Sequence, residues 1–219
     1  MKKIELCLER FTEKIRQVWE DNLVSVILYG SYLKEEFIPG VSDINLVVLT
    51  SKIDLQKLLL SRKTVLKFNR KYRIVPVFFT VDFFQSSFDS FALEWKEIKE
   101  GYKVLFGRDL IRKVEIKKEH LLFQIEREIK EDLIRFQQGL LFDWNLETLL
   151  LRSGRVLQII YRNLKDIYAE KEIAEAAAHL KIIEELRRKK VKLNKQRLKE
   201  LAEKHLLILN QLVKIMEEK

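Results

Sequence analysis

Gly30-Ser31, Ser42, Asp43 and Asn45 are the residues whose types and spacing could carry out chemistry. Glycine lets the backbone approach a phosphate closely because it has no Cβ, and the Ser31 hydroxyl can donate to a phosphate oxygen. Residues 43 and 45 are two positions apart, so on a strand their side chains project from one face and can ligate magnesium. The pattern therefore predicts a site for a nucleoside triphosphate with magnesium, and Ser42 is included among the nucleotide-binding residues.

The apolar residues around these positions predict the elements that must hold them in place. Each run of apolar side chains recurs either at helical spacing or at strand-like spacing. Helices are predicted over residues 2–20, 32–37 and 55–71, and strands over residues 24–29, 44–50 and 74–80. Gly30-Ser31 then directly follows the first strand, and Asp43 opens the second after a loop broken by Pro39-Gly40.

The rest of the chain changes from mixed to purely helical patterning. The aromatic-rich stretch 83–110 predicts short helices and an edge strand that returns to the sheet. Farther along, four helices are predicted over 122–140, 149–168, 174–186 and 198–216, with short connections at Asp143-Trp144-Asn145 and 189–195. We therefore predict an α+β chain: a small mixed sheet with flanking helices in residues 1–115, then an antiparallel helical bundle in residues 116–219.

The order of strand, Gly30-Ser31, Asp43 and second strand resembles the active-site segment of the DNA polymerase β-like nucleotidyltransferase superfamily. There the Gly-Ser turn contacts the nucleotide triphosphate, two aspartates separated by one residue bind metal, and a third carboxylate on a later strand completes the site. The resemblance implies that Gly30, Ser31 and Ser42 bind nucleotide, such as ATP, and that Asp43 and Asn45 bind magnesium. It also implies transfer of a nucleoside monophosphate to an acceptor hydroxyl, with Asp43 as a catalytic residue.

Two departures from the superfamily pattern weaken the prediction of catalysis. Asn45 stands where the second aspartate belongs, and a neutral amide holds divalent cations less strongly than a carboxylate. The predicted strand 74–80 carries no acid, so Asp82, just beyond it, is the first choice for the missing catalytic carboxylate, ahead of Asp89 and Glu94. The competing interpretation of Asp82 is a surface carboxylate at the start of a helix.

Three functions follow from these observations. The first is a nucleotidyltransferase that uses a nucleoside triphosphate and magnesium on an unidentified acceptor. The second is a catalytically degraded homologue that serves as a nucleotide sensor or as an antitoxin-like binding partner. The third is a nucleic-acid-binding module, which the net charge of +9 and the basic run 187–190 allow but do not single out, because acidic and basic residues alternate along the chain.

Composition sets the remaining expectations. The single cysteine, Cys7, excludes an intramolecular disulfide, and no apolar stretch approaches the length of a membrane span, so we predict a soluble cytoplasmic protein with no membrane partner. The surplus of positive charge makes aminoglycoside acceptors unfavourable. The histidines, at positions 120, 179 and 205, show no ligand spacing and receive no function. A homodimer is predicted only by analogy with two-domain relatives.

Overall fold

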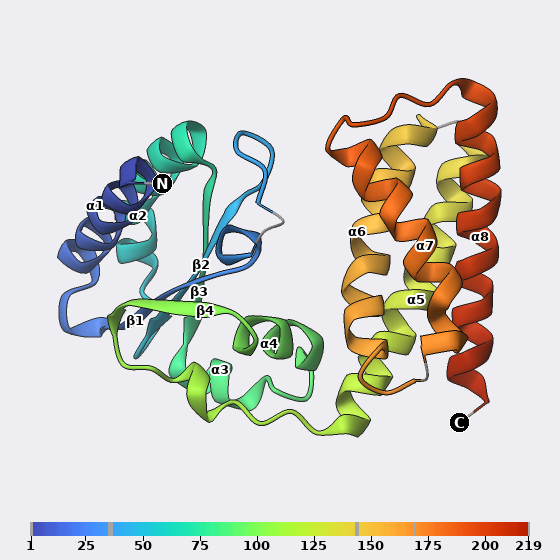
Figure 1. Cartoon of the computed structure of the whole chain (residues 1–219). Coiled ribbons are helices and arrows are strands. Elements are labelled where there is room, and N and C mark those ends of the chain that lie inside the picture. Colours follow the sequence, from blue (N-terminus) through green and yellow to red (C-terminus); the bar gives the residue numbers. More distant parts are fainter. Residues whose placement is uncertain (1, 35–36, 143–144, 169, 219) are drawn as a thin grey trace. The chain divides into compact units, whose positions relative to one another are not determined.

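The computed structural model divides into two compact units, Met1–Leu121 and Leu122–Lys219 (Figure 1). The structure describes residues 2–34, 37–142, 145–168 and 170–218. Two positions of the predicted helix 32–37 and most of the predicted connection at Asp143-Trp144-Asn145 lie outside the described residues. None of the described helices is long and apolar enough to cross a membrane.

The first unit is built on a four-stranded sheet in the order β3-β2-β1-β4. Its strands are β1 (Leu23–Tyr29), β2 (Ile44–Thr50), β3 (Ile74–Thr80) and β4 (Tyr102–Gly107). β1 is antiparallel to both β2 and β4, whereas β2 and β3 are parallel. The predicted mixed sheet is therefore confirmed, and β4 is the edge strand expected from the aromatic-rich stretch.

Helices cover both faces of this sheet (Figure 1). α1 (Lys2–Trp19) and α2 (Leu55–Tyr72) pack on one face, and α3 (Val81–Ser86) and α4 (Ala92–Lys99) pack on the other. Because strand side chains alternate between faces, Leu46 lies in the core under α1 and α2, while Val47 lies in the core under α3 and α4. Trp19 joins α1 to α2, since its fully buried indole N–H donates to the Ser61 hydroxyl at 2.9 Å.

The predicted helix 32–37 is a single 3-10 turn, Ser31–Leu33, in its described part. Lys34 already has an extended backbone, with φ −117° and ψ 161°, so the turn ends there. Two more 3-10 turns, Glu20–Asn22 and Ile111–Lys113, flank the strands of this unit. The described residues between this turn and β2, Lys34 and 37–43, thus form turns and irregular backbone rather than a helix.

The second unit consists of helices (Figure 1). They are α5 (Lys118–Leu141), which begins just before this unit, α6 (Leu146–Leu164), α7 (Glu170–Arg187) and α8 (Lys195–Glu217). Asn145 and Asn194 begin α6 and α8 as N-caps, because their side-chain oxygens accept from Thr148 N–H and Arg197 N–H. The helical region predicted for the second half is confirmed.

Candidate functional site

The Gly30-Ser31 turn leaves the end of β1 in a conformation that requires glycine. Gly30 has φ 86° and ψ −158°, a combination that L residues with a side chain rarely adopt. The following turn is closed by two backbone bonds, from Leu33 N–H to Gly30 C=O at 3.1 Å and from Lys34 N–H to Ser31 C=O at 3.0 Å. Gly30 and Ser31 are both half-buried, and the backbone at Gly30 carries no Cβ that would keep a ligand away.

Asn45 lies directly against this turn. Tyr29 and Asn45 are partners in the β1–β2 register, so the residue after Tyr29 lies beside the start of β2. The Asn45 amide nitrogen is 3.0 Å from the position that a Cβ on Gly30 would occupy. The structure thus brings together two of the predicted site residues, and they meet through the amide that stands in place of a metal-binding carboxylate.

Asp43 forms an ion pair that the sequence did not predict. Its Oδ1 lies 2.8 Å from Nη2 of Arg73, and both side chains are 47% exposed. Arg73 immediately precedes β3, just as Asp43 precedes β2, and Ile44 N–H donates to the Arg73 carbonyl at 2.9 Å. In a parallel strand pair, residues just before the strands lie side by side, and this signal could have predicted the contact.

Ser42 braces the loop that leads into β2. Its hydroxyl accepts from Ile38 N–H at 3.0 Å, and its own N–H donates to the Ile38 carbonyl at 2.8 Å. Lys34, another basic side chain near the turn, contacts Glu97 of α4 at 3.5 Å. The predicted nucleotide contact of Ser42 stays a prediction, and its hydroxyl has a structural partner already.

The candidate acids beyond β3 are placed unequally. Asp82 follows Thr80 at the far end of the parallel pair, whereas Asp43 precedes Ile44 at its beginning, which separates the two by the length of a strand, about 20 Å. The structure therefore does not bring Asp82 to Asp43. Asp82 is exposed in the first turn of α3.

Asp89 and Glu94 were the other candidates. Asp89 is exposed and accepts from the backbone and hydroxyl of the adjacent Ser90, which lowers the pKa of Asp89. Burial raises the pKa of Tyr29, and the nearby Glu94 carboxylate raises it further. Since Tyr29 is the strand partner of Asn45 and directly precedes Gly30, the charge of Glu94 acts near this end of β1.

β3 confirms the second departure that the sequence suggested. Its residues opposite Asn45 and Val47 are Val75 and Val77, which are apolar. Among the described residues, no three His, Cys, Asp or Glu side chains are grouped so that they could hold a metal ion. Among the described residues at the start of β2 and β3, the motif thus supplies a carboxylate paired with an arginine, Asp43 with Arg73, and the neutral amide of Asn45.

The helical unit buries a polar network that spacing alone did not reveal. Asp132 of α5, Ser153 of α6, His205 of α8 and His179 of α7 are each at most 4% exposed. The Ser153 hydroxyl lies 2.5 Å from both Asp132 Oδ2 and His205 Nε2, and His205 Nδ1 lies 2.8 Å from His179 Nε2. The histidines, scattered in sequence, are therefore neighbours, and each of the four helices contributes one member.

Burial shifts the titration of this network in opposite directions. It raises the pKa of Asp132 to about 6 and lowers the pKa of His179 to about 4 and that of His205 to about 3. The two imidazoles are therefore neutral near pH 7. The network is buried and connects side chains of α5, α6, α7 and α8.

Comparison with known proteins assigns the fold to a class. No family model matches the chain. The crystal structure of spectinomycin adenyltransferase AAD(9) from Enterococcus faecialis with ATP and spectinomycin has a TM-score of 0.63 at 13% identity, covering 95% of this chain and 98% of that one. A nucleotidyltransferase-like protein from Exiguobacterium sibiricum has a TM-score of only 0.40 at 15% identity, over 94% and 74% of the two chains. The first similarity shows a nucleotidyltransferase fold.

Sequence similarity then identifies the family. A Methanocaldococcus jannaschii protein, provisionally named a protein adenylyltransferase, is 32% identical over 113 residues, which are 49% of this chain and 75% of that protein. Together with the sheet and the Gly30-Ser31 turn, this relationship shows that the chain belongs to the DNA polymerase β-like nucleotidyltransferase superfamily.

Proposed function

We propose that the α/β unit binds a nucleoside triphosphate, with ATP as the first candidate, at the Gly30-Ser31 turn, and that it acts as a nucleotide-responsive protein with little or no transfer activity. The observation that supports this proposal is the contrast between the two halves of the superfamily motif. The phosphate-binding half is intact, with Gly30 at φ 86°. The metal-binding half has an ion-paired Asp43, a neutral Asn45 and an acid-free β3.

The residues at the turn suit an anion. Gly30 permits close approach of the backbone, and Ser31 contributes a hydroxyl donor. Asn45 introduces a hydrogen-bond donor where the superfamily has an aspartate. Its amide N–H groups can donate to a phosphate oxygen, whereas an ionised aspartate can only accept. The replacement therefore favours a phosphate contact at the place where the superfamily uses a metal ligand.

The same residues do not form a magnesium site by themselves. Magnesium is held by carboxylate oxygens together with substrate phosphates and water. Here Asp43 shares its Oδ1 with the Arg73 guanidinium, and Val75 occupies the β3 position beside Asn45. We therefore assign binding of the triphosphate to the chain's own donors and derive no step through a metal ion.

Two glycines provide a matched test of the binding site. Gly30 and Gly40 both have positive φ, 86° and 78°, but an added Cβ on Gly30 meets the Asn45 amide at 3.0 Å, whereas one on Gly40 meets nothing within 4 Å. Gly30→Ala should weaken ATP binding in calorimetry by at least tenfold, because the turn must move. Gly40→Ala should bind ATP within twofold of the unaltered chain.

Circular dichroism at the temperature of the titration verifies that both variants are folded. If the unaltered chain binds neither ATP nor another nucleoside triphosphate at millimolar concentration, with or without magnesium, the proposed function is wrong. Equal ATP affinities for Gly30→Ala and the unaltered chain would place the site elsewhere.

A second candidate, nucleotidyl transfer to an acceptor hydroxyl, is favoured by the adenylyltransferase relative. The chain would then retain Asp43 as its catalytic carboxylate. Incubation with α-labelled ATP and magnesium should in that case give a labelled product or labelled chain that is lost in Asp43→Ala. Transfer at a rate unaffected by Asp43→Ala would indicate a contaminating activity.

A further inference from the structure

Backbone hydrogen bonds fix the position of Arg73 beside the candidate site. It ends α2 with φ 57° and ψ 34°, and its N–H donates to the Asn69 carbonyl at 2.8 Å. Its own carbonyl accepts from Ile44 N–H at the start of β2. These bonds fix the Arg73 Cα at the beginning of β3, where the guanidinium reaches Asp43.

The strand register places Arg73 close to the phosphate-binding turn. β1 lies next to β2, and β2 lies next to β3, so the sheet end carries the Gly30 turn, Asp43 and Arg73 in a row. Neighbouring strands are about 4.8 Å apart, which puts the backbone of Arg73 about 10 Å from the turn. A triphosphate lying against Gly30 is within reach of a half-exposed arginine at that distance.

The positive charge of Arg73 matters at this end of the sheet because the proposed ligand is an anion. A triphosphate is highly anionic, and superfamily members neutralise it with metal ions held by carboxylates. Here Asn45 stands at one of those positions, β3 carries no acid, and the motif carboxylate Asp43 is already paired with a cation. The negative charge of a triphosphate at this end of the sheet must therefore be neutralised mainly by a cationic side chain.

We propose that the Arg73 guanidinium takes over the charge-neutralising role of the metal ions, so that the nucleoside triphosphate binds without a divalent cation. A guanidinium has five N–H donors and matches the geometry of phosphate oxygens, and one contact with Asp43 does not exhaust them. Asp43 is then an ion-pair partner of the guanidinium rather than a metal ligand. This inference rests on the proposed nucleotide-binding function.

Lys34 is a poorer choice for this role. Its ammonium contacts Glu97 at 3.5 Å, and its stem lies 3.5 Å from the position that a Cβ on Gly101 would take. The side chain is thus directed toward α4 and the start of β4. Arg73 is the cation whose partner, Asp43, belongs to the superfamily motif itself.

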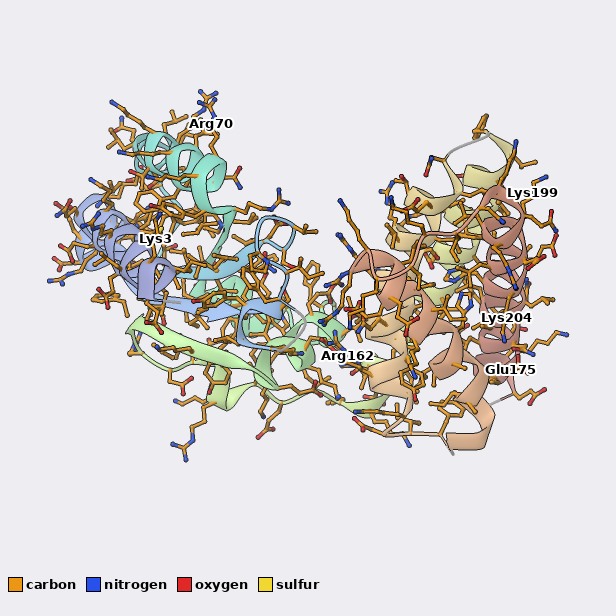
Figure 2. The ribbon with its side chains drawn as sticks, turned by 45° about the horizontal axis from the view of Figure 1, so that its top comes forward. Lys3, Arg70, Arg162, Glu175, Lys199 and Lys204 are labelled. Atoms are coloured by element: carbon orange, nitrogen blue, oxygen red, sulfur yellow. The ribbon has the colours of Figure 1, made fainter. Side chains whose placement is uncertain are left out.

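Calorimetric titration of the full chain with ATP, once in excess EDTA and once in magnesium, tests the inference. The dissociation constant should agree within about threefold between the two conditions. Arg73→Gln should weaken ATP binding at least tenfold in both, because a charge-assisted contact is lost. The matched control, Arg70→Gln, removes the same charge three residues earlier and should remain within twofold, since Arg70 projects outward from α2 (Figure 2).

Asp43→Asn gives the sharpest distinction, since the two models predict opposite signs. If Asp43 holds no metal and only forms an ion pair with Arg73, its neutralisation frees the guanidinium and removes a negative charge beside the triphosphate, so ATP affinity in EDTA stays equal or rises. If Asp43 holds a metal, the same substitution weakens ATP binding in magnesium at least tenfold. This variant also carries the test if Arg73→Gln fails to fold, as judged by circular dichroism.

The outcomes separate the inference from the function on which it rests. ATP binding that requires magnesium and is lost in Asp43→Asn overturns the role of Arg73 but leaves the nucleotide site intact. Equal affinity of Arg73→Gln and the unaltered chain overturns it as well. Absence of nucleotide binding under both conditions refutes the proposed function, and the inference with it.

Discussion

Replacing Asp132 with asparagine should stabilise the protein at neutral pH and change it little at pH 4. Burial raises the pKa of this carboxyl from 3.8 to about 6, so the folded chain binds a proton that the unfolded chain releases between these values. The stabilising contribution of Asp132 is therefore full below pH 3.8 and is lost as the pH rises through 6. The difference between the two pKa values lowers the free energy of unfolding by about 3 kcal/mol at pH 7, where Asp132 is ionised. Asparagine has no charge and does not incur this penalty.

The assay is urea denaturation of the full chain at pH 4, 5.5 and 7, followed by far-ultraviolet circular dichroism. Hydrogen exchange assigns the change to the helical unit. The lowered pKa values of His179 and His205 give stability that is present above pH 6.5 and lost as the pH falls, but this contribution is common to both proteins and cancels to first order in their difference. The control, Glu203→Gln, removes an exposed carboxylate from α8 and should show no such trend.

The opposite sign would refute this reasoning. If Asp132 were ionised and stabilised by a protonated His205 across the Ser153 hydroxyl, asparagine would remove one partner of a buried ion pair. Asp132→Asn would then be destabilised at pH 7 relative to the unaltered chain. A difference that does not change between pH 4 and 7 would equally contradict a raised pKa.

Two changes test the packing and accompany the ATP-binding experiments described above for Gly30, Asp43 and Arg73. Gly154→Ala places a Cβ 2.6 Å from Ile183 Cγ2 and should lower the free energy of unfolding by about 1–3 kcal/mol in urea denaturation. Adding Ile183→Ala to this variant should recover part of the loss. If the effects of the two substitutions on the free energy of unfolding are strictly additive, the two side chains do not clash. Ser61→Ala leaves the buried Trp19 indole N–H without its acceptor and should cost about 1–3 kcal/mol, whereas Ser86→Ala on the exposed side of α3 should cost less than about 0.5 kcal/mol.

The sequence determined the parts of this protein that depend on local spacing. Apolar alternation and helical periodicity identified the three strands β1 to β3 and the helical second half, because side-chain direction repeats every two residues on a strand and about every 3.6 on a helix. Residues 32–37, predicted as a helix, form a 3-10 turn in their described part, because so short a segment does not let periodicity distinguish the two forms. The sequence alone likewise predicted that β3 carries no acidic residue.

Tertiary structure decided which of the candidate residues meet. Asp82 and Arg73 flank the same strand in sequence, yet the parallel register of β2 and β3 leaves one about a strand's length from Asp43 and sets the other 2.8 Å from it. His179 and His205 are 26 residues apart and gave no local signal, but the helix packing places their rings in one buried network. Spacing fixes which way a side chain points, whereas register and burial fix what it touches, and only the folded chain contains that information.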